Sequence, residues 1–434
     1  MRQYKVYPSA IMKKDYQPKS TIYQMKSKVL LILLCSWYTM QAQSVTVTLD
    51  EAIQQALQKN KSIEAAMWDV EYQQQLKRTA LDVGKTSVVY MRGQYNSYTK
   101  DDNNITVSQS IPFPTVFTTQ QALHRSLVKG SELRKAVTEN DLVYQVKQVY
   151  HELQYLAACE ALLKRQDSIY TAFVKAADLR YRTGEARLLE KTTAETQHRE
   201  ILNLQAQVQA DILIYQEQLQ VLINSEQPVQ IGQRSLTERT WESPMDSASV
   251  QSNPELVYFK QQTEVTTRER KVASARFLPD ITVGYFNQTL IGTPVNASGE
   301  LATKSDRFQG FEVGLAIPLW FGPQAAKVKA ASMQQKKVQA EYEHLQTRTQ
   351  AQWQQAVQQY TKNRNTVNYY KTSAVVNAEL ILKQATIAFR NGEIGYTEYW
   401  LAVRNAMQLQ ENYLRAINAL NQSVVTLEFL AGTR

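Results

Sequence analysis

The sequence predicts a mainly α-helical protein with membrane β structure, built from two copies of one helix–hairpin–helix unit. Three observations support this fold class. The apolar period changes from two residues to three or four at Pro112 and again at Pro318. A helical pattern of roughly 65 residues follows each proline, far beyond the length of a globular helix. A Gly-Glu pair then interrupts each pattern, at Gly184 and at Gly392. Because proline cannot donate to a sheet ladder and disfavours α geometry in the preceding residue, it suits a strand-to-helix junction.

Residues 1–43 are interpreted as an upstream extension followed by an export signal that begins at Met25. Two lysines precede an apolar run over residues 29–34, which is too short to span a bilayer as a helix. Cys35 follows Leu34, where a lipobox would have a small residue, so lipidation of Cys35 is left open. After cleavage Cys159 is the only cysteine, which excludes an intrachain disulfide.

The net charge of +9 does not indicate a nucleic-acid surface. Most of the excess lies in the first 28 residues, and no basic stripe alternates with aromatic residues. Surplus lysine and arginine along long helices is typical of a solvated face.

The first repeat is predicted over residues 44–223. Thr48 is expected to cap a helix that runs to about Leu81 and ends before Gly84. Alternation predicts strands over residues 88–98 and 105–111, joined by a polar tip. A long helix should run from Pro114 to about Arg182. Its predicted coiled-coil seam has residues seven apart: Leu142, Val149, Leu156, Leu163, Tyr170 and Ala177.

The second repeat is predicted over residues 253–434, after a connector (224–252) that is rich in helix-breaking residues and should lie against the helices. It comprises a helix from Asn253, strands over 281–290 and 308–317, and a long helix to about Arg390. Gly392 should form a tight turn before a closing helix. The seam of the long helix should contain Trp353, Tyr360, Val367, Ala374, Ile381 and Ala388.

The four strands have about the length that crosses a bilayer when tilted, ~9–11 residues. A membrane sheet must close, and four strands cannot form a barrel, so several copies of the chain are expected to share one. A water-filled lumen would be lined by Arg92, Gln94, Asn96, Thr106, Ser108 and Glu312, and lipid would contact Val89, Met91, Tyr95, Val107, Phe311, Val313 and Leu315. Alternation by itself also fits a soluble sheet with one wet face.

The paired architecture, the Ile-Pro junctions and the Arg-Thr-Gly-Glu and Arg-Asn-Gly-Glu tips resemble the TolC family of outer-membrane efflux ducts over about residues 46–430. The resemblance implies a homotrimer whose strands form one twelve-stranded β-barrel in outer-membrane lipid, continued by an α-helical barrel across the periplasm. It also implies two partners at the helical tips, a periplasmic adaptor (membrane fusion protein) and an inner-membrane RND pump. The sequence looks closest to the heavy-metal branch, with CusC and CzcC.

The resemblance also assigns candidate site residues. A carboxylate after the second tip turn helps to constrict the aperture in the family, and it corresponds to Glu398, with Glu190 in the first repeat. Leu401 stands where relatives carry a second acid. Both glutamates could instead be ordinary solvated helix residues. The tip turns that would meet an adaptor contain Gly184, Glu185, Gly392 and Glu393, and the junctions at the periplasmic rim of the barrel contain Pro112, Pro114 and Pro318.

An enzymatic function has little support. The four histidines are scattered, and no HExxH, CxxC, Walker A or GxSxG motif is present. We therefore predict no catalytic residue, no cofactor and no bound metal. The resemblance implies a passive duct for heavy-metal cations in a tripartite efflux system. The alternatives are a TolC-type duct for drug efflux or type I protein secretion, and, in another class, a soluble periplasmic coiled-coil adaptor. An exported hydrolase would need a nucleophile and base that the sequence does not show.

Overall fold

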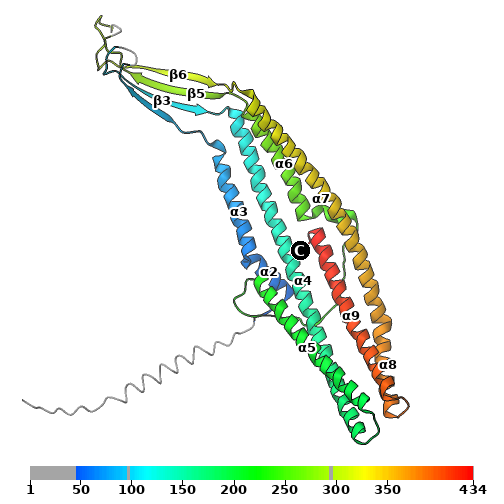
Figure 1. The fold of residues 1–434 in the computed structure, drawn as a ribbon. Coiled ribbons are helices and arrows are strands. Elements are labelled where there is room, and N and C mark those ends of the chain that lie inside the picture. The colour runs from blue at the N-terminus through cyan, green and yellow to red at the C-terminus, as the bar shows by residue number, and fades with distance from the viewer. Residues whose placement is uncertain (1–44, 95–97, 293–296, 434) are drawn as a thin grey trace, which may run out of the picture.

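The chain is elongated, with a small sheet at one end and long helices extending away from it (Figure 1). The structure is a computed structural model, and it describes residues 45–94, 98–292 and 297–433. The predicted export signal, Cys35 and two positions of the first hairpin tip, Tyr95 and Asn96, lie outside these residues. No helix among the described residues combines the length and apolar character needed to cross a membrane.

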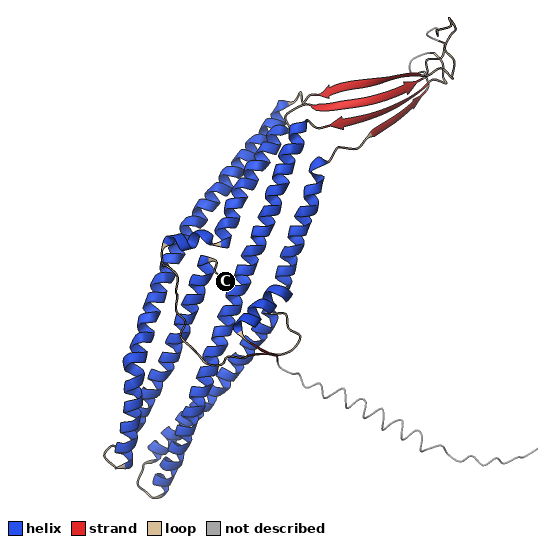
Figure 2. Ribbon diagram, turned by 180° about the vertical axis from the view of Figure 1, so that it is seen from behind, coloured by secondary structure: helices blue, strands red, loops and turns tan. Residues whose placement is uncertain are grey.

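The predicted repeat order is confirmed. The first repeat contains α2 (Leu49–Lys59), α3 (Lys61–Lys77), β2 (Ser87–Arg92), β3 (Asn103–Ile111), α4 (Pro114–Arg182) and α5 (Leu188–Leu222). The second contains α6 (Pro254–Ala275), β5 (Asp280–Gln288), β6 (Phe308–Ala316), α7 (Phe321–Tyr369), α8 (Val375–Arg390) and α9 (Tyr396–Ala431). Figure 2 shows the strands of the two hairpins gathered beyond one end of the helices.

The single first helix predicted from Thr48 to Leu81 is wrong, because Asn60 divides it. Thr48 caps α2 through a reciprocal capping box with Glu51, as its sequence suggests. Asn60 then adopts an extended ψ of 131° and caps α3 by accepting a hydrogen bond from the Ser62 amide. A short 3-10 helix, Arg78–Leu81, ends this segment.

Asn60 has a counterpart in the second repeat, Asn253, which caps α6 in the same way. The side-chain amide of Asn60 donates to the carbonyl of Leu222 at the end of α5, at 2.8 Å. The side-chain amide of Asn253 donates to the carbonyl of Leu430 at the end of α9, at 3.0 Å. Each asparagine thus satisfies an orphan carbonyl of one helix while it starts another. Helix α3 is therefore the repeat partner of α6, and α2 is an addition at the front.

The two hairpins form one antiparallel sheet in the order β2-β3-β5-β6. Strands β2 and β6 lie at its edges within the described chain. The predicted strand over 88–98 is too long: β2 ends at Arg92, and Gly93 has a φ of +133° that leaves strand geometry. The other strands begin or end within two residues of their predicted bounds.

Helix α4 has the predicted length and buries the whole predicted seam, from Leu142 to Ala177. The seam of the second long helix is correct only as far as Ala374. A single π turn, Tyr370–Ala374, inserts one residue between α7 and α8. The insertion shifts the helical phase, so Ile381 is 39% exposed and Ala378 and Ala385 are buried in its place.

The connector lies against the helices. Its strand β4 (Val229–Ile231) pairs in parallel with β1 (Val45–Val47), and both join a buried cluster with α2, α4 and α5. Farther along, the Trp241 ring packs edge-on against Trp353 with centroids 5.9 Å apart. The connector thus joins the two repeats and packs against the main buried clusters of both.

Candidate functional site

The two helical tips are built alike. Gly184 and Gly392 have φ angles of +77° and +76°, the left-handed geometry in which a side chain would be strained. The amide of Glu185 donates to the Arg180 carbonyl, and that of Glu393 donates to the Ala388 carbonyl, both at 2.8 Å. This pattern closes the preceding helix and reverses the chain, so that α5 and α9 run back beside α4 and α8 (Figure 1).

The predicted aperture carboxylates stand in equivalent places. Glu190 is the third residue of α5, and Glu398 is the third residue of α9. Both lie where the helix dipole favours a negative charge. Glu398 is exposed, and its Oε2 accepts a hydrogen bond from the Gly395 amide at 3.2 Å. Glu398 therefore has a capping role of its own, and its side chain stands at the far end of the helices, close to the turn.

An aromatic cluster, which the sequence analysis did not find, joins the two helical hairpins near the tips. The rings of Phe173 and Tyr396 stack with centroids 4.6 Å apart, and Phe389 stacks on Tyr399 at the same distance. The Tyr396 hydroxyl donates to the Glu190 carbonyl at 3.3 Å. Burial raises the pKa of Tyr396, so it remains a neutral donor. The tips of the two repeats are thus held together within one chain by stacking and one hydrogen bond.

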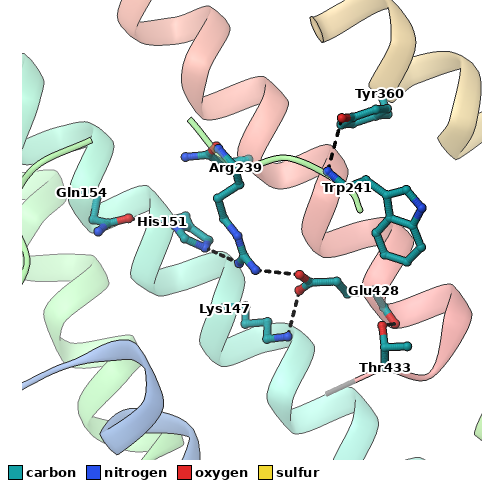
Figure 3. A network of polar contacts seen from close by, with 9 residues as sticks. Lys147, His151, Gln154, Arg239, Trp241, Tyr360, Glu428 and Thr433 are labelled. Carbon is teal, nitrogen blue, oxygen red and sulfur yellow. Dashed lines mark hydrogen bonds and ion pairs between the residues drawn. The ribbon is translucent and has the colours of Figure 1, made fainter. Parts of the chain in front are cut away.

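A buried polar network fastens the connector to α4 and α9 (Figure 3). The carboxylate of Glu428 pairs with Lys147 at 2.8 Å and with Arg239 of the connector at 2.6 Å. A second guanidinium nitrogen of Arg239 lies 2.8 Å from Nε2 of His151. Nδ1 of His151 lies 2.8 Å from the Gln154 amide oxygen. Burial lowers the pKa of His151 to about 4, with a smaller contribution from the Arg239 charge. The ring is therefore neutral and accepts from Arg239.

The sheet register separates two faces. Residues directly opposite in antiparallel strands lie on one face. Glu312 pairs with Gly284, which pairs with Ser108, so these share a face with Thr106. This face is largely polar or small. A side chain at Gly284 would collide with the Glu312 carboxyl group, so glycine leaves room for it. The opposite face is apolar over most of its area and contains Val88, Tyr90, Ile105, Val107, Ile281, Val283, Tyr285, Phe311, Val313 and Leu315.

The face predicted for β2 is wrong. Val89 pairs with Thr106 and therefore lies on the polar face, as does Met91. Arg92 pairs with Asn103 on the otherwise apolar face, at the hairpin tip, where it forms an ion pair with Asp101. Gln94 lies beyond the end of β2, and its side chain donates to the Tyr98 carbonyl at 2.6 Å. Of the predicted lumen residues, Thr106, Ser108 and Glu312 share the polar face.

The proline junctions lie where the sheet meets the helices. Pro112 follows β3, and Pro114 is the first residue of α4. Pro318 lies between β6 and α7, and neither junction is inside a helix. No group of three or more His, Cys, Asp or Glu residues with metal-binding geometry occurs within the described ranges.

Comparisons with known proteins agree with this architecture. Residues 247–433 match the sequence model of the outer membrane efflux protein family. The fold is similar to CusC (17% identity, 90% of this chain and 93% of CusC, TM-score 0.74). It is also similar to VceC of Vibrio cholerae (17% identity, 89% of this chain and 96% of VceC, TM-score 0.73). The outer-membrane channel OprN is similar as well (15% identity, 89% of this chain and 90% of OprN, TM-score 0.75). None of the curated proteins matches the chain.

At these identities the structural matches establish the fold, and the sequence match covers the second repeat. The matched family is a family of outer membrane efflux proteins. Two of the solved structures with this fold, VceC and OprN, are outer-membrane proteins, which agrees with the predicted location, the outer membrane with the helices in the periplasm. The sequence match over the second repeat and the shared fold over both repeats confirm the resemblance of this chain to the TolC family of outer membrane efflux proteins.

Proposed function

We propose that three copies of this chain form a passive exit duct of a tripartite efflux system, and that its cargo is heavy-metal cations. The four-stranded sheet carries the proposal. The outer edges of its strands β2 and β6 have no pairing partner within the described chain. One of its faces is apolar and exposed, with Phe311 86% and Val313 76% exposed. A sheet with an apolar outer face can lie in lipid only if its edges are closed. Pairing β2 of one copy with β6 of the next closes it.

In this arrangement the polar face, with Glu312, lines water, and the helices continue the wall of the lumen toward the tips. A periplasmic adaptor would meet the tips around Gly184, Glu185, Gly392 and Glu393, and an inner-membrane RND pump would supply the energy. The similarity to outer-membrane channels favours this function over the soluble adaptor.

Membrane fractionation followed by native mass measurement tests the duct. We expect a trimer that is extracted from outer membranes only by detergent. A water-soluble monomer, released without detergent, would refute the duct and favour the adaptor.

The metal cargo rests on the resemblance to CusC and CzcC. Deleting the gene should increase sensitivity to at least one of zinc, cadmium, cobalt, copper and silver, and re-expression should restore resistance. Unchanged resistance to all five, together with increased drug sensitivity or lost protein secretion, would assign the duct to one of the alternative cargoes.

The proposed aperture can be tested at Glu398. Threefold symmetry would place three such carboxylates around one opening, which favours cations. Glutamine can still accept the hydrogen bond from the Gly395 amide, so Glu398→Gln removes the charge and keeps the cap. In planar bilayers under a salt gradient, we expect Glu398→Gln to lower the cation-to-anion permeability ratio roughly twofold or more. The control is Glu379→Gln at an exposed position of α8. Equal ratios in both variants would leave Glu398 as a helix cap alone.

A further inference from the structure

A basic groove lies between α6 and α7, immediately next to the sheet. It encloses about 830 Å³, and its lining includes Arg270, Lys271, Ser274, Phe277, Lys329 and Ser332. The three cations are exposed, and no acidic residue lines the groove. Within the described part of the chain, none of the three forms an ion pair. The groove therefore offers positive charge and hydroxyl groups without a counterion.

A second cavity, here called the mixed cavity because acidic and basic side chains both line it, lies on the opposite side of the same helices. The mixed cavity is lined by Glu269 and Val272 of α6 and by Arg276, the residue that caps its C-terminus. The groove is lined by Arg270, Lys271 and Ser274, so the two use different faces of α6. Asp280 of β5 also lines the mixed cavity. Asp280 pairs with Ala316, on the same polar sheet face as Glu312. The mixed cavity thus belongs to the lumen side, and the basic groove belongs to the side of the apolar sheet face.

Exposed apolar residues connect that sheet face to the groove. Leu315 and Ile317 are 63% and 57% exposed, and Leu319 and Trp320 follow at 76% and 85%. The next residue, Phe321, stacks on Phe277 of the groove with ring centroids 5.9 Å apart. The first repeat has no such feature, because its junction is shorter and Phe113 there is half-buried. Within the described residues, the second junction thus connects the apolar sheet to the cations through the aromatic side chains of Trp320 and Phe321.

We propose that this groove binds the phosphate headgroup of an anionic phospholipid in the periplasmic leaflet of the outer membrane, with Trp320 at the level of the headgroups and upper acyl chains. Lysine and arginine beside a membrane attract anionic headgroups, and tryptophan prefers the interface. The order of apolar sheet, aromatic residues and cations follows the order of acyl chain, interface and phosphate. The inference rests on the proposed placement of the sheet in the membrane.

A lipid fits this surface better than a second copy of the chain. The free strand edges, where copies would meet, are at β2 and β6. The groove lies between α6 and α7 of one chain, with Thr119 of α4 also in its lining. A neighbouring copy would also have to supply negative charge to three unpaired cations, whereas a phospholipid brings its own phosphate.

Lipid binding to the detergent-purified trimer tests the groove. The variant Arg270→Gln/Lys271→Gln/Lys329→Gln removes its charge, and Lys260→Gln/Lys336→Gln/Lys337→Gln removes three exposed cations of the same two helices farther from the sheet. By native mass spectrometry with phosphatidylglycerol and phosphatidylcholine, we expect the groove variant to bind phosphatidylglycerol about tenfold more weakly. The control variant should bind phosphatidylglycerol as the unchanged protein does, and the binding of phosphatidylcholine should be the same in all three proteins. Equal loss in both variants, or displacement of the lipid by millimolar inorganic phosphate, would overturn the proposal.

Tryptophan fluorescence tests whether Trp320 lies at the level of the lipid headgroups. In vesicles that contain lipids brominated near the headgroup, Trp320→Phe should lose a measurable part of the tryptophan quenching seen in the unchanged protein. Trp68→Phe, at a 66% exposed position of α3, should not. Equal quenching in both variants would overturn the placement of Trp320. A protein that forms no trimer or does not enter vesicles would refute the proposed duct, whereas an inserted trimer without preference for phosphatidylglycerol would refute the lipid site only.

Discussion

Replacing Glu428 by alanine should lower the free energy of unfolding by about 3–5 kcal/mol, the usual cost of removing one partner from a buried ion pair. Glu428 is the counterion of both Lys147 and Arg239, whose side chains are 7% and 27% exposed. Without the carboxylate, two cations stay in a site that excludes most water. Chemical denaturation of the detergent-solubilised protein, followed by helical circular dichroism at fixed protein concentration, measures the change.

The control for Glu428 is an exposed carboxylate in an ion pair. Glu341 pairs with Lys337 on α7, with side chains 47% and 65% exposed. Glu341→Ala should cost less than about 1 kcal/mol, because solvent screens such pairs. Since Arg239 holds the connector, Glu428→Ala should also speed proteolysis of the connector between residues 233 and 246. Similar costs for both variants would show that the network contributes no more than a surface pair.

The second prediction is that acid lowers the free energy of unfolding through His151. The buried His151 ring, 4% exposed, accepts a hydrogen bond from Arg239 and must be neutral to do so. Its pKa falls from an ordinary value of 6.5 to about 4 because burial disfavours the charged ring. Between these two pH values the unfolded chain binds a proton that the folded chain does not. Stability is therefore fully present above pH 6.5 and is lost as the pH falls toward 4, by about 3 kcal/mol at most.

The charges around His151 determine how it responds to acid. Arg239 and Lys147 are positive and oppose protonation, whereas Glu428 favours it. In His151→Gln the amide oxygen can still accept from Arg239 but does not titrate. Measured from pH 7 to pH 4, the difference in unfolding free energy between the unchanged protein and His151→Gln should shift by up to about 3 kcal/mol. The exposed His344, replaced by glutamine, is the control and should leave the pH profile nearly unchanged. A constant difference for His151→Gln would contradict the prediction.

Local chemistry explains which parts of the fold could be predicted. Proline lacks a backbone donor, so Pro112 and Pro318 indicate the strand-to-helix junctions without reference to the rest of the chain. Glycine alone adopts a positive φ without strain, so Gly184 and Gly392 indicate the tight turns between helices. The seam of α4 repeats every seven residues because one face of a long helix is buried, and the buried residues are those predicted.

The errors arose where the local sequence pattern does not record a contact, a strand pairing or an inserted residue. The local pattern predicts that Asn60 lies inside a helix. In the structure its side-chain amide donates to the carbonyl of Leu222, 162 residues away in the sequence. The face of Arg92 depends on its pairing with Asn103, and a shift of one residue reverses every side chain of a strand. The π turn at Tyr370–Ala374 inserts one residue into a continuous helical pattern and turns Ile381 outward.

By itself the sequence determined the two repeats, the junctions, the turns and the α4 seam, because each depends on the covalent properties of a few residues or on a period within one helix. Only the tertiary structure placed Arg239 between Glu428 and His151, gathered Phe173 and Tyr396 at the tips, and aligned the basic groove with the apolar face of the sheet. These groups come from segments far apart in the chain. Their contacts depend on how whole helices and strands pack, and no local pattern records that packing.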